Sequence, residues 1–311
     1  MFKSLTILSA AVIIGFTNLA AATVGTTDAA VPVKMVVTAN VENGKRAPEI
    51  KPEDVSVKKG KDRLPVADWV PARGDRAGLE LFILIDDASL HTLGNQLGDL
   101  RNFIHAQPKT TAIGVGYARN AVVEIRQNFT TNHELAAKAL RLPLGTAGSY
   151  GSAYLSVVDL MKRWPDTPNR REVLLVTDGI DRAHRAHNAL LNPDVDTAAA
   201  VAQRTGTIVH SIYFPGVGHW HRNYWVASNG QNGLAKLSDI TGGESFFMGW
   251  PAPVSFAPYL SDLQRILDNQ YLLTINATPG KKAGLQYMNV TTEIPGVDFA
   301  TPDAAWVPAA K

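Results

Sequence analysis

The chain has no cysteine among its 311 residues. This absence excludes disulfide bonds, thiolate catalysis, cysteine-ligated metals and attachment of a lipid to a cysteine. Charged residues are also few, at 19% of the chain, whereas 45% of the residues are hydrophobic. A chain of this length and apolar content can bury one large core and a smaller second one without covalent cross-links.

The chain has no strong excess of charge of either sign. Its 30 basic and 28 acidic residues leave a formal net charge of +2. This balance argues against nucleic acid as the main partner, because neutralising phosphates requires a concentrated basic face. The one basic cluster, in residues 58–63 (KKGKDR), has the composition of a turn, and we predict that it is a solvated hairpin tip.

The first 22 residues have the pattern of a secretory signal peptide. Lys3 supplies the positive start, residues 5–16 are apolar, and residues 20–22 (AAA) offer a cleavage site with small side chains. The apolar part is short for crossing a bilayer, and the alternative is an uncleaved N-terminal anchor. We therefore expect an exported protein, periplasmic or secreted, with no membrane span after signal cleavage.

Two apolar runs end in acidic residues. Residues 173–176 (VLLV) stop at Thr177 and Asp178, and residues 81–85 (LFILI) stop at residues 86–89 (DDAS). Runs without polar alternation are typical of strands that helices bury on both faces. Open sheets of such strands bind their ligands at the carboxyl ends. The sequence therefore predicts an acidic site at that edge of a parallel sheet.

Residues 79–268 alternate between predicted strands and predicted helices. The strands are expected at residues 79–85, 172–177, 207–213 and 244–247, with a hairpin from 111–117 and 121–126. The helices are expected at residues 93–106, 132–140, 154–164, 197–204, 233–241 and 256–269. This order predicts an α/β fold with a doubly wound, mainly parallel sheet and helices on both faces.

The flanks of this region read as strands alone. Residues 32–75 carry short strands that are punctuated by prolines and Asn43-Gly44, and residues 270–308 carry strands at 270–276, 286–292 and 297–300. We expect the two flanks to pair into one small β module.

Two motifs in the middle region are similar to those of a known superfamily. Residues 173–179 (VLLVTDG) and 234–247 (LAKLSDITGGESFF) resemble von Willebrand factor type A domains. The flanks resemble those of exported bacterial type A-related proteins of the acidobacterial group. The resemblance implies a Rossmann-like type A domain over residues 79–268, with a metal-ion-dependent adhesion site at the carboxyl end of its sheet.

Two of the three loops of that implied metal site have matching residues. The family pattern places Asp-x-Ser-x-Ser in the first loop, Thr in the second and Asp in the third. Asp178 matches the third loop, and Thr146, Ser149 or Ser152 matches the second.

The first loop fits the family pattern in neither register. If Asp86 takes the aspartate position, the serine positions fall on Ala88 and Leu90. If Asp87 takes it, Ser89 fits and a histidine stands at the last position, which is a poor ligand for Mg²⁺. The strand length favours the first register and the ligand chemistry favours the second.

The resemblance thus implies an incomplete site for a hard cation, Mg²⁺ or Ca²⁺, which prefers oxygen ligands. The implied ligands are Asp86, Asp87, Ser89, Thr146 and Asp178. In the alternative, Asp86 and Asp178 cap helix N-termini and accept loop N–H groups, and no metal binds.

An aromatic and basic segment follows the predicted strand at 207–213. Aromatic side chains next to arginine are a common composition for protein contact. The candidate partner-binding residues are His219, Trp220, His221, Arg222, Tyr224 and Trp225.

The leading hypothesis is an exported protein-binding protein, adhesive or scaffold-like, that engages a protein partner at the carboxyl end of its sheet. No nucleophile elbow, phosphate loop, dinucleotide fingerprint or His-Glu-x-x-His motif is present in the sequence, and we predict no enzymatic activity. One alternative is a metal-dependent hydrolase that uses His184, His187 and Asp181. Another is a metal-free assembly factor of the cell envelope.

Overall fold

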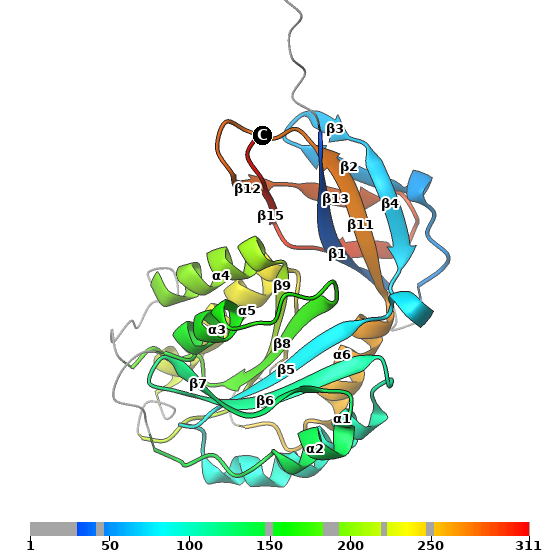
Figure 1. The fold of residues 1–311 in the computed structure, drawn as a ribbon. Coiled ribbons are helices and arrows are strands. Elements are labelled where there is room, and N and C mark those ends of the chain that lie inside the picture. The colour runs from blue at the N-terminus through cyan, green and yellow to red at the C-terminus, as the bar shows by residue number, and fades with distance from the viewer. Residues whose placement is uncertain are drawn as a thin grey trace, which may run out of the picture.

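The fold, obtained as a computed structural model, consists of two packed units (Figure 1). The structure describes residues 30–41, 47–146, 152–182, 193–218, 223–246 and 252–310. The expected signal peptide therefore lies outside the described residues. One unit is an α/β sandwich, and the other is built from strands near both ends of the chain.

The α/β unit has a six-stranded sheet in the order β10-β9-β8-β5-β6-β7. The strands are β5 (Leu79–Asp86), β6 (Thr111–Arg119), β7 (Val122–Thr130), β8 (Arg170–Thr177), β9 (Thr207–Tyr213) and β10 (Ser245–Phe246). All neighbours run parallel except β6 and β7, which are antiparallel. The prediction of an α/β fold with a mainly parallel sheet covered by helices is confirmed.

Helices cover both faces of this sheet (Figure 1). They are α1 (Leu97–Ala106), α2 (His133–Lys138), α3 (Ala153–Lys162), α4 (Pro193–Thr205), α5 (Tyr224–Thr241) and α6 (Ala257–Asp268). Ile83 of β5 belongs to the core formed with α1, α2 and α6, whereas its neighbour Leu84 belongs to the core formed with α3, α4 and α5. Successive side chains of a strand point to opposite faces, so burial on both faces explains the uninterrupted apolar runs. No helix within the described ranges combines the length and apolar content needed to cross a bilayer.

Some predicted element boundaries were wrong. The helix expected at 233–241 begins at Tyr224, because the Asn223 side chain caps it by accepting hydrogen bonds from the backbone N–H groups of Trp225 (3.0 Å) and Val226 (3.3 Å). Tyr224 and Trp225 therefore lie in the first turn of α5 rather than in a loop. The helix expected at 93–106 starts as a 3-10 helix, His91–Gln96, which continues into α1.

The β unit consists of three small antiparallel sheets. Its strands are β1 (Val31–Val41), β2 (Val55–Lys59), β3 (Asp62–Leu64), β4 (Val66–Pro71), β11 (Gln270–Ala277), β12 (Gly284–Tyr287), β13 (Asn289–Thr292), β14 (Val297–Ala300) and β15 (Ala304–Val307). The sheet orders are β14-β1-β11-β4, β13-β2-β3 and β12-β15. The single strand expected at 286–292 is interrupted at Met288, whose N–H donates to Asp303 O (3.0 Å), and β15 was not predicted.

The core of the β unit is organised around an aromatic pair. The Trp69 ring on β4 stacks on that of Tyr271 on β11, with centroids 4.6 Å apart, and the Trp69 indole N–H donates to Ile50 O (3.0 Å). Leu273 and Ile275 of β11 are fully buried beside this pair. A buried indole with a satisfied N–H is a stable core element, because no polar group is left unpaired.

A buried arginine holds the two connections between the units. The Arg170 guanidinium donates to Ala77 O (3.0 Å) in the segment that enters the α/β unit. It also donates to Leu267 O (3.3 Å) and to the Gln270 side chain, in the segment that leaves this unit. Burial lowers the pKa of Arg170, which is only 7% exposed, and the nearby charge of Glu172 opposes this shift. One cation therefore joins the two segments (the chain crossings) through which the chain passes from one unit to the other.

We predict that Arg170→Met lowers the free energy of unfolding by roughly 1.5–3 kcal/mol, since a charged group loses its hydrogen bonds to buried acceptors. Chemical denaturation measures this change. Arg126→Met is the control, because Arg126 pairs with Glu124 (3.0 Å) on the surface and such pairs contribute at most about 1 kcal/mol. Equal losses in the two variants would contradict a role for Arg170 in holding the crossings.

Candidate functional site

The carboxyl ends of β5 and β8 bring two predicted site residues together. Asp86 ends β5, and Asp178 directly follows Thr177 at the end of β8. One carboxylate oxygen of Asp86 accepts a hydrogen bond from the Thr177 hydroxyl (2.7 Å), and the other accepts one from the Ala88 N–H (2.8 Å). Both oxygens of Asp86 thus have protein donors.

An arginine forms an ion pair with the second carboxylate. The Arg182 guanidinium donates to both oxygens of Asp178, one of them at 3.3 Å, and the Ile180 N–H also donates to Asp178 (3.0 Å). The Asp178 side chain is fully buried and that of Arg182 is 14% exposed. Burial acts to lower the pKa of Arg182, but the charges of Asp178 and Asp86 outweigh it and raise this pKa. The chain itself therefore supplies a permanent cation at the acidic edge.

The loop after β9 closes over this ion pair. A Cβ atom on Gly216 would lie 2.3 Å from both the Arg182 guanidinium and the Asp178 carboxylate, so only glycine permits this approach. The loop is held to the first loop by two backbone hydrogen bonds, Leu90 N–H to Pro215 O (3.0 Å) and Val217 N–H to Ala88 O (2.7 Å). The remaining cavity beside Asp86 and Arg182 is about 30 Å³, which is room for about one water molecule.

The pKa of Asp86 is raised from 3.8 to about 6. Burial is the largest cause, and the negative charge of Asp178 adds to it. The charge of Arg182 and the hydrogen bonds from Thr177 and Ala88 lower this pKa in part. Asp86 therefore takes up a proton at a higher pH than an ordinary aspartate, because one guanidinium only partly compensates two buried carboxylates.

Asp87, the other candidate for the first-loop aspartate, lies in a different set of contacts. Its oxygens accept hydrogen bonds from the Arg141 guanidinium at 2.7 and 3.0 Å, and one also accepts from the Leu144 N–H (2.9 Å). Arg141 lies over the Tyr117 ring, 3.8 Å from its centroid. Asp87 thus anchors the segment that follows α2, and Asp86 is the aspartate that hydrogen-bonds at the end of β8.

The hydroxyl groups expected to complete the site have other placements. Ser89 is 1% exposed and its Oγ has no hydrogen-bond partner in the described structure, whereas Thr146 is exposed. Ser152 lines the small cavity, but its hydroxyl donates to Asp194 (2.7 Å) and caps α3. Ser149 lies outside the described residues.

This donor set does not fit Mg²⁺ or Ca²⁺. Such ions require six or more oxygen ligands, of which water can supply only some. The oxygens of Asp86 and Asp178 already accept from N–H groups, a hydroxyl and a guanidinium, and Ala88 has no oxygen on its side chain. Within the described ranges, no group of three or more His, Asp or Glu side chains is placed to hold a metal. Arg182 is not among the site residues predicted from the sequence, where its one signal is a basic residue four positions after Asp178.

Two of the predicted partner-binding residues are exposed at the same edge. Tyr224 and Trp225 begin α5, which follows β9, and their side chains are 66% and 76% exposed. Their rings form an edge-to-face pair with centroids 5.9 Å apart. The other residues predicted for this surface, His219, Trp220, His221 and Arg222, lie outside the described residues.

The group suggested for hydrolysis is described only in part. Asp181 is 1% exposed, so it is buried rather than part of a solvated loop. His184 and His187 lie outside the described residues.

We predict that Asp86 makes the protein less stable as the pH rises from about 4 to about 6. The folded state binds this proton more tightly than the unfolded chain does, so protonation of Asp86 stabilises the fold at low pH. This stabilisation is lost as the pH rises through that window, and the total loss is about 3 kcal/mol by pH 7. Asp86→Asn should remove this slope in the free energy of unfolding. The control Asp166→Asn, at a fully exposed side chain, should retain it, and an unchanged slope in Asp86→Asn would refute the assignment.

Removal of the internal cation should leave the acidic pair uncompensated. We predict that Arg182→Gln lowers the free energy of unfolding by about 3–5 kcal/mol, and that millimolar Mg²⁺ does not restore it. Thermal denaturation with Mg²⁺ or with a chelator measures both effects. Arg126→Gln, at an exposed pair with Glu124, should change stability by less than about 1 kcal/mol. Clear stabilisation of the unaltered protein by Mg²⁺ would contradict the poor fit of the site.

No protein-family model matches the sequence, and no curated protein matches it either. Solved structures with a similar fold include a von Willebrand factor type A protein from Catenulispora acidiphila (9% identity, TM-score 0.45, 92% of this chain and 75% of that one). An aerotolerance-related membrane protein from Bacteroides fragilis matches at 11% identity and a TM-score of 0.45, over 61% of this chain and 99% of that one. Proximal thread matrix protein 1 from the mussel byssus, with a zinc-occupied MIDAS motif, matches at 9% identity and a TM-score of 0.40, over 64% of this chain and 47% of that one. At these identities the likeness concerns the fold alone.

Proposed function

We propose that this protein is an exported, metal-independent protein-binding module of the type A kind, which docks a partner at the carboxyl edge of its sheet. The observation that carries the proposal is the exposed Tyr224–Trp225 pair at the edge where Arg182 forms an ion pair with Asp178. Export rests on the signal-like pattern of residues 1–22.

The aromatic pair has the properties of an interface anchor. Tryptophan and tyrosine dominate the binding energy of many interfaces, because they bury a large area and lose few rotamers. Trp225 is 76% exposed and Tyr224 66% exposed, so a partner can cover both rings. The Asn223 cap fixes the first turn of α5, so the two rings are presented on a rigid element.

The internal ion pair supports the proposal that binding at this edge is metal-independent. In the family that the sequence resembles, the cation at this edge has unfilled coordination positions for an acidic group of a partner. Here Arg182 forms its ion pair with Asp178 and only 14% of its side chain is exposed, so it offers little surface to a second carboxylate. We therefore assign the binding energy to the aromatic surface, and we infer that Mg²⁺ and Ca²⁺ are not cofactors.

A binding role agrees better with the described site than a hydrolytic one does. Asp181 is buried, and a general base must reach a water or substrate within hydrogen-bonding distance. No observation in the described part of the chain favours the hydrolase or the assembly-factor alternative.

The test is capture of partners from the cell-envelope fraction, followed by affinity measurement with the purified partner. We expect the complex to form in the presence of a chelator and to weaken about 30-fold with Trp225→Ala, as a loss of about 2 kcal/mol implies. Tyr287→Ala is the matched control, because Tyr287 is an equally exposed aromatic residue (75%) on β12 of the other unit. A complex that requires divalent cations, or that is equally weakened by both substitutions, would disprove the proposal.

A further inference from the structure

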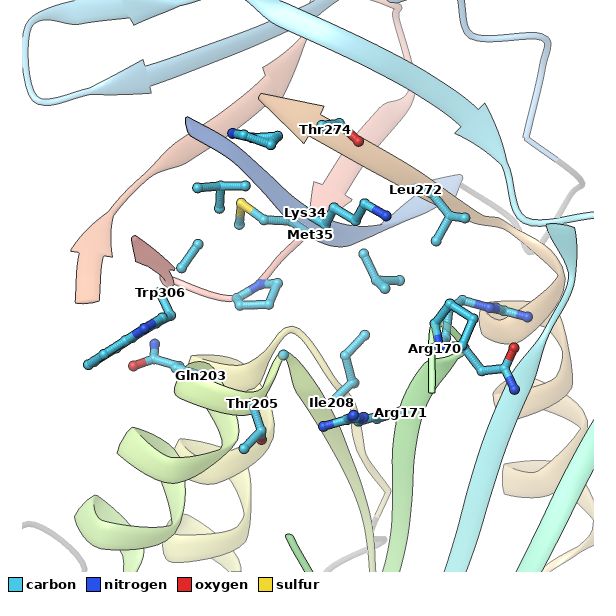
Figure 2. Close-up of a pocket in the computed structure, with 18 of the residues that line it drawn as sticks. Lys34, Met35, Arg170, Arg171, Gln203, Thr205, Ile208, Leu272, Thr274 and Trp306 are labelled. Carbon is cyan, nitrogen blue, oxygen red and sulfur yellow. The ribbon is translucent and has the colours of Figure 1, made fainter. Parts of the chain in front are cut away.

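A cleft separates the β unit from the amino ends of β8 and β9 (Figure 2). Its volume is about 600 Å³, and it lies at the opposite end of the sheet from the acidic site. Figure 2 shows Arg170 toward one end of the cleft and Trp306 with Gln203 toward the other. A cavity of this volume at the boundary between two units is typical of small-molecule binding sites.

The outer face of the sheet β14-β1-β11-β4 forms one wall of the cleft. The strand register places Lys34, Thr274 and Asp68 in one row across β1, β11 and β4. The next row on the same face consists of Val36, Leu272 and Val70. This wall therefore offers an apolar strip beside a polar one.

The opposite wall, formed by the α/β unit, is cationic, and an aromatic residue of the β unit adjoins it. Arg171 is the second residue of β8, after Arg170, and Ile208 lies near the start of β9 (Figure 2). Arg204, near the end of α4, lies over the Trp306 ring at 5.2 Å from its centroid. The indole face thus holds a guanidinium at the cleft.

Positive charge exceeds negative charge around the cleft. The basic lining residues are Lys34, Arg76, Arg170, Arg171 and Arg204, and the one acidic lining residue is Asp68. Within the described ranges, no ion pair involves Lys34, Arg76 or Arg204.

A buried donor at the cleft also lacks a partner. Arg170 is only 7% exposed, and its Nε has no hydrogen-bond partner in the described structure. Buried polar groups in folded proteins are nearly always paired with protein, water or a bound group, so this donor has room for one acceptor beside the cavity.

We propose that this cleft binds a small organic anion with an apolar body, such as a carboxylate or a phosphate ester that carries a hydrocarbon chain. Lys34 and Arg204, which have no ion-pair partner within the described ranges, attract the anionic group, and the hydrocarbon packs on the strip of Val36 and Leu272. A peptide that adds as a strand is a poorer occupant, because β1 and β11 are interior strands and their backbone groups are already paired with neighbouring strands.

The test is isothermal titration calorimetry of the full chain with four eight-carbon probes. Octanoate and octyl phosphate carry the two candidate anionic groups, while octan-1-ol and octylammonium share the chain and lack the negative charge. We expect the anions to bind and the other two to bind at least tenfold more weakly. The stronger of the two anions identifies the head group. Equal binding of all four probes, or binding of none, would overturn the proposal.

Substitutions locate the binding in the cleft. Lys34→Gln and Arg204→Gln should each weaken anion binding about tenfold, as loss of one charge-assisted contact implies. Lys61→Gln is the matched control, because Lys61 is exposed in the turn between β2 and β3 and does not line the cleft. Val36→Thr should reduce the advantage of octanoate over butyrate. Unchanged affinity in both cleft variants, or equal weakening in Lys61→Gln, would place the site elsewhere.

This site is independent of the proposed docking edge. Trp225→Ala should leave octanoate affinity unchanged, and Lys34→Gln should leave capture of the protein partner unchanged. A failure of one proposal is therefore distinguishable from a failure of the other.

Discussion

The arrangement of the two units depends on the buried cation of Arg170. Its guanidinium hydrogen-bonds to Ala77 in the segment that enters the α/β unit, and to Leu267 and Gln270 in the segment that leaves it. A buried arginine is costly to desolvate, and here backbone carbonyls and an amide offset that cost. The same residue begins β8 and lines the cleft, so this cation also links the connections between the units to the cleft.

A second buried cation, Arg182, determines the chemistry of the opposite end of the sheet. A guanidinium and a divalent metal both compensate the charge of carboxylates, but they differ in whether they can bind a further ligand. A metal keeps exchangeable positions, whereas the guanidinium of Arg182 is held by Asp178 and covered by the loop at Gly216. The described part of this edge therefore has little room for a small ligand, and the rings that we propose for recognition lie on α5.

The sequence predicted the features that depend on local pattern. The unbroken apolar runs indicated β5 and β8, and the rule that parallel strands end at one edge placed Asp86 near Asp178. The start of α5 was missed, because its polar and glycine-containing turns lack an apolar stripe. The contacts of Arg182 were also unpredictable, since the path of a long side chain depends on a glycine from another loop. The cleft brings together Lys34 and Arg204, which no local pattern connects.

The pairing of β1 with β11 has a consequence for how the chain folds. Val31 lies opposite Ala277, so the central pair of the β unit forms only after the whole α/β unit has been synthesised. Closing so long a loop is entropically costly in an unfolded chain, and contacts of high sequence separation slow folding. Once the α/β unit is folded, its two ends lie together at Arg170, and most of that closure cost has been met. We therefore expect the α/β unit to fold first and to act as the template on which the β unit assembles.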